Sequence, residues 1–450
     1  MSSLYTKTVT NVIFPLHEKL KKHDTVAIKN KMEVSQWWAT EDILDFQLQR
    51  LKTLLSRINQ HVPYYQKLFT DIGFKPENVS SVSDLQQLPF LTKEVIRENI
   101  DDLKANNAVG LSRFNTGGSS GAPLIFFIGK ERVSHDVAAK WRATRWWDVD
   151  IGDPEIVVWG SPIELGAQDR IKQIRDKLLR TELISAFEMS DLKLDEFVKK
   201  IVEFKPKMLF GYPSSLSLIA DHASKKGIDV SRLGIKVAFV TSEKLYDHQR
   251  EKIERIFGCK VANGYGGRDA GFIAHQCPKG SMHITAEDII VEIVGSDGQN
   301  LAVGEAGEIV VTHLATKDFP FIRYRTGDVG VLSNETCRCG RGLPILKEIQ
   351  GRSTDFVISA DGTIMHGLAL IYVLRDIEGI ELFKIVQESK LLTNIFIVVS
   401  SAFAPESVIK IESGIKERLG MSVEVSIELV ESIAAEKSGK FRYVVSHAIN

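Results

Sequence analysis

Short apolar runs alternate with amphipathic helical stretches between residues 155 and 257. The apolar runs are residues 155–159, 208–210 and 237–240, and the helical stretches are residues 170–180, 195–203, 214–226 and 246–257. Strands that alternate with helices pair in parallel, because a parallel neighbour is reached only through a crossover connection. The pattern therefore predicts a doubly wound α/β fold. The sequence contains no internal repeat, which is the main signature of solenoid and propeller folds, so it does not favour either of them.

The rest of the chain predicts a second, smaller domain. At 450 residues the chain is long enough for two or three domains. After residue 259 it becomes richer in strands, expected at 283–294 and 308–314, and beyond residue 351 short strands and two helical stretches indicate a small α+β unit. We expect a large N-terminal α/β domain, residues 1–350, and a C-terminal domain, residues 351–450.

Composition and charge exclude several classes of protein. Hydrophobic residues make up 44% and charged residues 26% of the chain, which is the usage of a folded protein. The net charge of −1 gives no overall attraction to nucleic acid or to an anionic membrane, although a local basic patch is compatible with it. The apolar run 12–14 is too short for a secretory signal or a membrane span. We expect a cytoplasmic protein, with a monomer and a homodimer both open.

The segment Thr116-Gly117-Gly118-Ser119-Ser120-Gly121 is the strongest local motif. Its glycines lack side chains, so backbone N–H groups can approach an anion, and its hydroxyls add further donors. The segment therefore predicts a phosphate-binding loop, with a flexible turn as the alternative. It differs from the Walker motif, which places Lys and Ser or Thr after its last glycine.

Four further motifs follow in the order in which adenylate-forming ligases have them. They are Asn263-Gly264-Tyr265-Gly266-Gly267-Arg268-Asp269, Tyr324-Arg325-Thr326-Gly327-Asp328, Gly351-Arg352 and Ser438-Gly439-Lys440. With the loop they resemble that superfamily, and within it the phenylacetate-CoA ligase family and its CapK-type relatives of capsular polysaccharide biosynthesis. The resemblance implies a large N-terminal α/β domain of the acyl-CoA synthetase type and a smaller mobile C-terminal α+β lid. It also implies ATP-dependent activation of an aryl or related carboxylic acid as an acyl-adenylate, then as a CoA thioester.

The resemblance also assigns residues to ATP and magnesium. A carboxylate that attacks the α-phosphorus is an anion approaching an anion, so such a site mainly neutralises and positions. Asp328 would accept hydrogen bonds from the ribose, and Asp269, where the family has Glu, would ligate Mg²⁺. A solvated carboxylate in a glycine-rich turn is the alternative for Asp269. The other residues expected at the nucleotide are Thr116, Gly117, Gly118, Ser119, Ser120, Gly121, Ser242, Glu243, Tyr265, Gly266 and Arg352.

The resemblance places the catalytic lysine and the hinge in the last hundred residues. An ammonium between the carboxylate and the α-phosphate stabilises charge that develops in the transition state. Lys440 follows a glycine as the family's catalytic lysine does, with Lys437 as the nearby alternative. The lid would turn about Thr354 and Asp355, next to Arg352, although many relatives have Asp at the position of Thr354.

Three of the four cysteines and one histidine have metal-ligand spacing. Cys277 is followed six residues later by His283, and Cys337 comes 54 residues after that histidine, with Cys339 two residues further on. Three thiolates and an imidazole form the ligand set of a closed structural Zn²⁺ site without a catalytic role. His275 can replace His283 in this prediction, free thiols in a reducing cell are the alternative, and Cys259 is expected in the core.

The acyl substrate and the acceptor are least constrained. Trp159 and Tyr212 follow presumed strands at their carboxyl ends, where open α/β sheets bind ligands, so they predict either an apolar acyl pocket or core packing. One alternative function is a CapK-type enzyme that passes the acyl group to an amine instead of CoA. A second is an inactive zinc-stabilised interaction protein.

Overall fold

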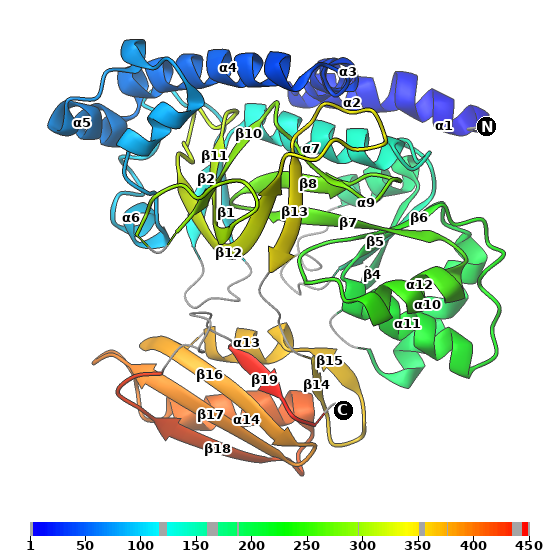
Figure 1. The fold of residues 1–450 in the computed structure, drawn as a ribbon. Coiled ribbons are helices and arrows are strands. Elements are labelled where there is room, and N and C mark those ends of the chain that lie inside the picture. The colour runs from blue at the N-terminus through cyan, green and yellow to red at the C-terminus, as the bar shows by residue number, and fades with distance from the viewer. Residues whose placement is uncertain are drawn as a thin grey trace.

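The N-terminal helices form a layer along one side of the molecule (Figure 1). The computed structural model describes residues 3–116, 124–159, 170–186, 189–295, 297–350, 356–375, 377–433 and 443–448. The layer contains α1 (Leu4–Thr8), the π-helical turn η1 (Val9–Ile13), α2 (Phe14–Lys21), α3 (Thr25–Ser35), α4 (Thr40–His61) and α5 (Pro63–Ile72). Helix α4 buries Ile43, Leu51, Leu55 and Ile58, which recur at helical spacing and face the core. Among the described residues, no helix combines the length and the apolar composition that crossing a bilayer requires.

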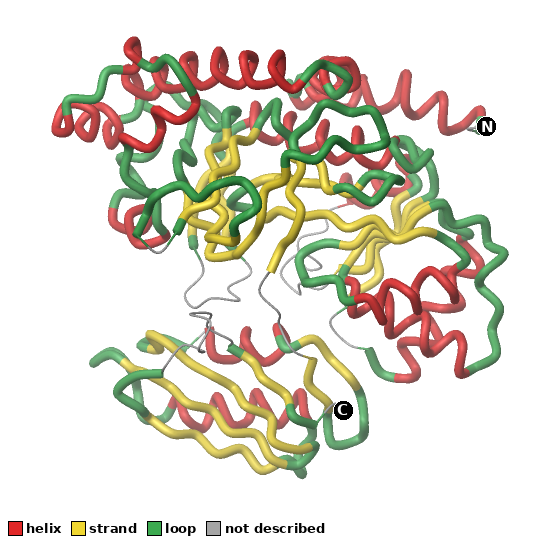
Figure 2. The backbone as a smooth tube through the Cα atoms, viewed as in Figure 1, coloured by secondary structure: helices red, strands yellow, loops and turns green. Residues whose placement is uncertain are grey.

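Five strands pair in parallel, as the alternation of strands and helices predicts. They are β3 (Glu155–Trp159), β4 (Thr181–Ser185), β5 (Met208–Gly211), β6 (Val237–Val240) and β7 (Lys260–Gly267). The helices between them are α9 (Arg170–Leu179), α10 (Asp191–Phe204), α11 (Pro213–Lys225) and α12 (Asp247–Phe257) (Figure 2). Leu209 and Val240 enter the core formed with α10–α12, whereas Phe210 and Phe239 pack with Ala143 of α7 (Lys130–Arg145) on the other face. Both faces of this half of the sheet are covered, as a doubly wound fold requires.

Strand β4 extends the sequence prediction, which contained no strand at residues 181–185. This segment reads Thr-Glu-Leu-Ile-Ser and has no continuous apolar run like those of its neighbours. It lies at the edge of the sheet, where only one neighbouring strand covers it. An edge strand needs fewer apolar side chains, so its sequence signal is weak.

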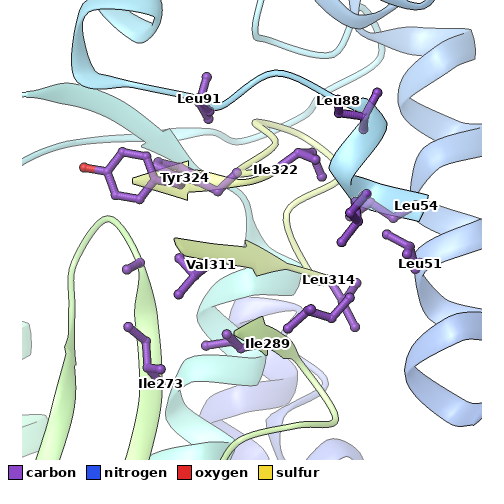
Figure 3. Packing of buried hydrophobic residues seen from close by; sticks show 14 of the residues in the cluster. Leu51, Leu54, Leu88, Leu91, Ile273, Ile289, Val311, Leu314, Ile322 and Tyr324 are labelled. Carbon is purple, nitrogen blue, oxygen red and sulfur yellow. The ribbon is translucent and has the colours of Figure 1, made fainter. Parts of the chain in front are cut away.

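Six antiparallel strands continue the same sheet beyond β7. They are β8 (Gly271–Gln276), β9 (Met282–Ile284), β10 (Ile289–Val294), β11 (Ala306–His313), β12 (Tyr324–Ser333) and β13 (Ile345–Gln350). The complete order of the eleven strands is β10-β11-β12-β13-β9-β8-β7-β6-β5-β3-β4. The largest core lies where these strands meet α4, with Leu51 and Leu54 on the side of Leu314, and with Ile289 and Val311 in the same cluster (Figure 3). The more β-rich texture expected after residue 259 is confirmed.

A hairpin and several short helices complete the part of the molecule before residue 351. The hairpin pairs β1 (Ser112–Asn115) with β2 (Ile125–Ile128). The short helices are η2 (Pro76–Asn78), η3 (Val82–Gln87) and α6 (Lys93–Glu98). Phe126 of β2 is fully buried against Phe321, so the hairpin is attached to the main core.

The last hundred residues form a separate sheet with its own core. Strands β16 (Ile380–Ser389), β17 (Leu392–Val399), β18 (Glu424–Leu429) and β19 (Val444–Ser446) pair in the order β18-β17-β16-β19. The other elements are α13 (Leu368–Arg375), α14 (Ser407–Leu419) and the pair β14 (Phe356–Ile358) and β15 (Ile364–His366). Buried Ile385, Ile397 and Ile415 join one cluster. The α+β texture expected here is confirmed, while the boundary placed at 351–355 lies outside the described residues and stays a prediction.

Candidate nucleotide and metal sites

Tyr265 and Asp328 are brought together by two strands of the large sheet. Tyr265 lies on β7 and Asp328 on β12, and the Tyr265 hydroxyl donates to Asp328 Oδ2 at 3.0 Å. Removal from water and then the negative charge of Asp328 raise the pKa of Tyr265 well above its usual value, so the hydroxyl keeps its proton. The Asp328 amide donates to Thr326 Oγ1 at 3.1 Å, which fixes the turn at this position. The phenol therefore acts as a fixed donor that orients the carboxylate.

The same two motifs meet a second time at Asp269. Tyr324, fully buried at the start of β12, donates its hydroxyl to Asp269 Oδ2 at 2.6 Å, and the Ala270 amide donates to Oδ1 at 3.0 Å. The sequence analysis assigned no role to Tyr324. Its position at the start of the motif that also contains Asp328 was the only indication that it lies at the site. The structure thus groups Tyr265, Asp269 and Asp328, as the nucleotide prediction requires.

The turn that carries Asp269 is supported from helix α7. Arg132, which is 2% exposed, donates from Nη2 to the carbonyl oxygen of Arg268 at 2.8 Å. A Cβ atom on Gly271 would lie 2.7 Å from the ring of His313, so the turn passes too close to that ring for any side chain. Gly271 also has a φ of +85°, which favours glycine. Close packing therefore fixes the backbone on both sides of Asp269.

Glu243 lies after strand β6 and faces the first turn of helix α11. Its Oε2 accepts hydrogen bonds from the hydroxyl of Ser214 and from the Ser214 amide, the latter at 3.4 Å. A carboxylate is favoured there because the first amides of a helix lack partners within it. Ser242 has a φ of +72°, a conformation that non-glycine residues rarely adopt. Both residues lie at the carboxyl end of the parallel strands, where such folds bind ligands.

Thr116 closes the hairpin from which the predicted phosphate loop extends. Its Oγ1 accepts from the Leu124 amide at 3.0 Å, and its amide donates to the Leu124 carbonyl at 3.0 Å. The other loop residues, Gly117, Gly118, Ser119, Ser120 and Gly121, lie outside the described residues. So do Arg352, Thr354, Asp355, Lys437 and Lys440, and their roles stay predictions.

The predicted acyl-pocket residues form an aromatic stack. The rings of Trp159 and Tyr212 are 4.6 Å apart with an interplanar angle of 22°, and Phe210 lies 6.1 Å from Trp159 on centroids. Tyr212 is 6% exposed and belongs to the α10–α12 core, whereas Trp159 is half-buried. This burial favours core packing for Tyr212, and the substrate role stays a prediction for both.

Cys277, His283, Cys337 and Cys339 converge, as their spacing predicts. One ligand atom from each lies within 4.8 Å of all the others. Cys339 Sγ is 3.2 Å from His283 Nε2, and the two sulfurs of Cys277 and Cys337 are 3.6 Å apart. His283 Nδ1 is 3.1 Å from the Leu343 carbonyl, which as an acceptor holds the proton at Nδ1 and leaves Nε2 for a metal. Burial lowers the pKa of His283 to about 4, so the imidazole is neutral at physiological pH.

The structure also decides between the two histidines and places the fourth cysteine. His275 is buried between the rings of Phe239 and Phe272 and does not belong to the cluster. The choice left open from the sequence therefore falls on His283. Cys259 is buried, and burial raises its pKa to about 12, which confirms the expected core position.

The N-terminal helices hold the loop that carries Cys339. Gly342 donates its amide to the Gln36 carbonyl at 3.1 Å, and Arg341 donates to Gln36 Oε1 at 3.0 Å. The Arg341 guanidinium also lies over the ring of Trp37 at 4.6 Å. A Cβ on Gly342 would lie 1.9 Å from the Trp38 carbonyl oxygen, so glycine is required there. The loop is thus built into the fold with or without a metal.

Known proteins share this architecture along nearly the whole chain. The sequence model of the CapK C-terminal domain matches residues 357–447. Protein CapK of Staphylococcus aureus is 25% identical over 448 residues, covering 96% of this chain and 94% of that protein. A phenylacetate-coenzyme A ligase of Thermus thermophilus is 24% identical over 332 residues, covering 71% of this chain and 72% of the ligase.

By these relatives the chain is a ligase of the adenylate-forming class, similar over most of its length to the phenylacetate-CoA ligase and CapK branch of that superfamily. The fold agrees: the crystal structure of 2-hydroxyisobutyryl-CoA ligase with 2-HIB-AMP and CoA has a TM-score of 0.66, with 19% identity and 92% coverage of each chain.

Proposed function

We propose that this adenylate-forming ligase activates an aryl or related carboxylic acid with ATP and then transfers the acyl group to the thiol of CoA. The observation that carries the proposal is the double pairing of two distant motifs, Tyr265 with Asp328 and Tyr324 with Asp269. Two oriented carboxylates thereby lie next to the carboxyl ends of the parallel strands.

Each carboxylate has a task that its geometry supports. Asp328 accepts one hydrogen bond from Tyr265, and a carboxylate has several lone pairs, so the ribose hydroxyls can donate to the same group. The Asp269 carboxylate, held by Tyr324 and the Ala270 amide, offers the hard oxygen ligands that Mg²⁺ prefers. Bound magnesium would neutralise charge on the phosphates. Asp is one methylene shorter than the family's Glu, and the backbone that carries it is held by Arg132 and by the close approach of Gly271 to His313.

In the first half-reaction the substrate carboxylate attacks the α-phosphorus, and pyrophosphate leaves. Lys440 supplies the ammonium that stabilises the developing charge, and the loop from Thr116 to Gly121 holds the β- and γ-phosphates. In the second half-reaction the CoA thiol attacks the acyl carbon, and AMP leaves. These assignments rest on the motifs of the family.

The cluster of Cys277, His283, Cys337 and Cys339 is proposed as a structural zinc site. Its four groups match the number of protein ligands in a closed structural zinc site, which would leave no open position for a substrate. The metal would tie the β8–β9 hairpin to the loop before β13.

A second function is favoured by the extent of the CapK match. That relative aligns over 96% of the chain, whereas the phenylacetate-CoA ligase aligns over 71%, and the C-terminal residues match the CapK domain. The alternative is therefore transfer of the acyl group from the adenylate to an amine.

ATP–pyrophosphate exchange over a panel of aryl and aliphatic carboxylic acids tests the shared first step. We expect exchange that depends on one class of acid, and exchange with none of them would contradict adenylation. Product analysis with CoA, with amines and with neither then separates the acceptors. A thioester formed only with CoA supports the first proposal, and an amide formed without CoA supports the alternative.

A further inference from the structure

The N-terminal helical run exposes an apolar ridge on its outer side. Residues Leu4, Val12, Leu16 and Leu20 are 82%, 59%, 57% and 76% exposed, and they define the N-terminal ridge. The opposite side buries Thr6, Val9, Phe14 and Glu18 against the protein. Side chains spaced by four residues drift around a regular α-helix by about 40° per step. The π-helical turn η1 takes up an extra residue and offsets this drift, so the ridge residues keep to one side.

The segment that carries the N-terminal ridge has an excess of exposed lysines. Within residues 3–31 the exposed charged side chains are Lys7, Lys19, Lys21, Lys22, Lys31 and Asp24. The ion pairs of this segment involve His17, His23 and Lys29, so none of the five exposed lysines pairs with a described residue. Glu18 is buried and its carboxylate contacts His17, His23 and Thr25. The whole chain carries a net charge of −1, so this positive excess is local.

We propose that this face docks on an anionic lipid surface, with the helix lying in the plane of the interface. An amphipathic helix binds in this way when its apolar side chains enter the headgroup region and its lysines meet acidic headgroups. Lysine stems cover apolar area while their ammonium groups reach outward, so the flanking lysines and the ridge can act together. The inference is independent of the acceptor in the proposed reaction.

Charge favours a lipid surface over a second copy of the chain. Two copies paired antiparallel about the middle of the ridge would bring Lys7 of one close to Lys19 of the other. Like charges placed together oppose such pairing, whereas an anionic surface attracts both. The helical layer also lies on the side of the large sheet away from β14–β19 (Figure 1). Docking therefore leaves the C-terminal elements clear of the membrane.

Flotation of the full-length protein with vesicles tests the proposal. The probes are vesicles of phosphatidylcholine alone and of an equimolar mixture with phosphatidylglycerol, each at low and high salt. We expect binding to the anionic vesicles, weaker at high salt. The double variant Leu16→Glu/Leu20→Glu should bind at least about tenfold more weakly, and Lys19→Glu/Lys21→Glu about thirtyfold more weakly.

Matched controls separate docking from general effects of new charge. Leu192→Glu and Lys199→Glu alter exposed residues of α10, on another part of the surface, and should bind as the unchanged protein does. All variants should retain ATP–pyrophosphate exchange in solution, because none touches the nucleotide site. Equal binding to both vesicle types, no binding, or full binding by both double variants would overturn the proposal. The proposal would also be overturned if the protein were a dimer in solution, and Leu16→Glu/Leu20→Glu dissociated this dimer without weakening vesicle binding.

Discussion

The Tyr265 hydroxyl is the clearest example of a single group that orients a residue of the candidate nucleotide site. Its hydrogen bond to Asp328 is 3.0 Å long and involves a charged acceptor. Such bonds contribute roughly 1.5–3 kcal/mol. We expect Tyr265→Phe to lower kcat/KM for ATP in the exchange assay by about tenfold or more. Tyr64→Phe is the control, because Tyr64 is also partly buried but its hydroxyl has no hydrogen bond among the described residues. Exchange by Tyr265→Phe at the unchanged rate would contradict the assignment of Asp328.

Asp269 should determine the magnesium concentration that the exchange reaction requires. Asp269→Asn keeps the shape and can still accept from Tyr324, but it loses the charge that a hard cation requires. We expect the magnesium concentration for half-maximal exchange to rise at least about tenfold, with a melting temperature close to that of the parent. Asp269→Glu restores the family residue and should recover much of the affinity. A magnesium dependence unchanged by Asp269→Asn would exclude it as a ligand.

The buried His275 should make the free energy of unfolding depend on pH. Burial, and then the positive charge of Arg142, lower its pKa from 6.5 to about 3. The unfolded chain therefore binds more protons than the folded one between these values, and stability is lost as pH falls through that range. His275→Phe should remove about 2 kcal/mol of the loss between pH 6.5 and 4.5, measured by urea unfolding at both pH values. An unchanged difference between the two pH values would show that His275 is not the group responsible.

At the scale of elements, the cysteine and histidine cluster ties the β8–β9 hairpin to the loop before β13. A metal that binds only the folded chain stabilises it through that binding. We expect about one zinc per chain in protein purified without chelator, and Cys337→Ser should lose it and melt at a lower temperature. Cys259→Ala is the matched control, because Cys259 lies in the core outside the cluster. If the protein contains no zinc and Cys337→Ser melts at the temperature of the parent, the cysteines of the cluster are free thiols and the zinc proposal is wrong.

Local sequence patterns predict the buried strands better than the strand at the edge of the sheet. Strands β3, β5 and β6 are continuous apolar runs because both of their faces are covered, and their sequence signal is correspondingly strong. Strand β4 at the edge lacks that signal. The cluster of four metal-type ligands was also predictable, because close spacing within each pair limits how far its members can separate.

At the scale of the whole molecule, the proposed reaction requires the C-terminal lysine motif to reach a nucleotide bound at the large sheet. We expect Lys440→Ala to lower ATP–pyrophosphate exchange by about two to three orders of magnitude, the usual loss for one preorganised donor. Lys437→Ala, three residues earlier in the chain, should leave exchange near the parent rate. The opposite ranking of the two variants would move the catalytic role to Lys437.

The sequence by itself determined most of the order of strands and helices, the motifs of the superfamily and the cysteines of the candidate metal cluster. These properties are local, since they depend on periodicity and on residues within a few positions of one another. Only the tertiary structure decided that Tyr265 pairs with Asp328, that Tyr324 pairs with Asp269, and that His283 rather than His275 joins the cysteines. Each of these contacts joins segments whose distance depends on strand order and register in the sheet. Strand order and register are set by packing of the whole core, which no short stretch of sequence encodes.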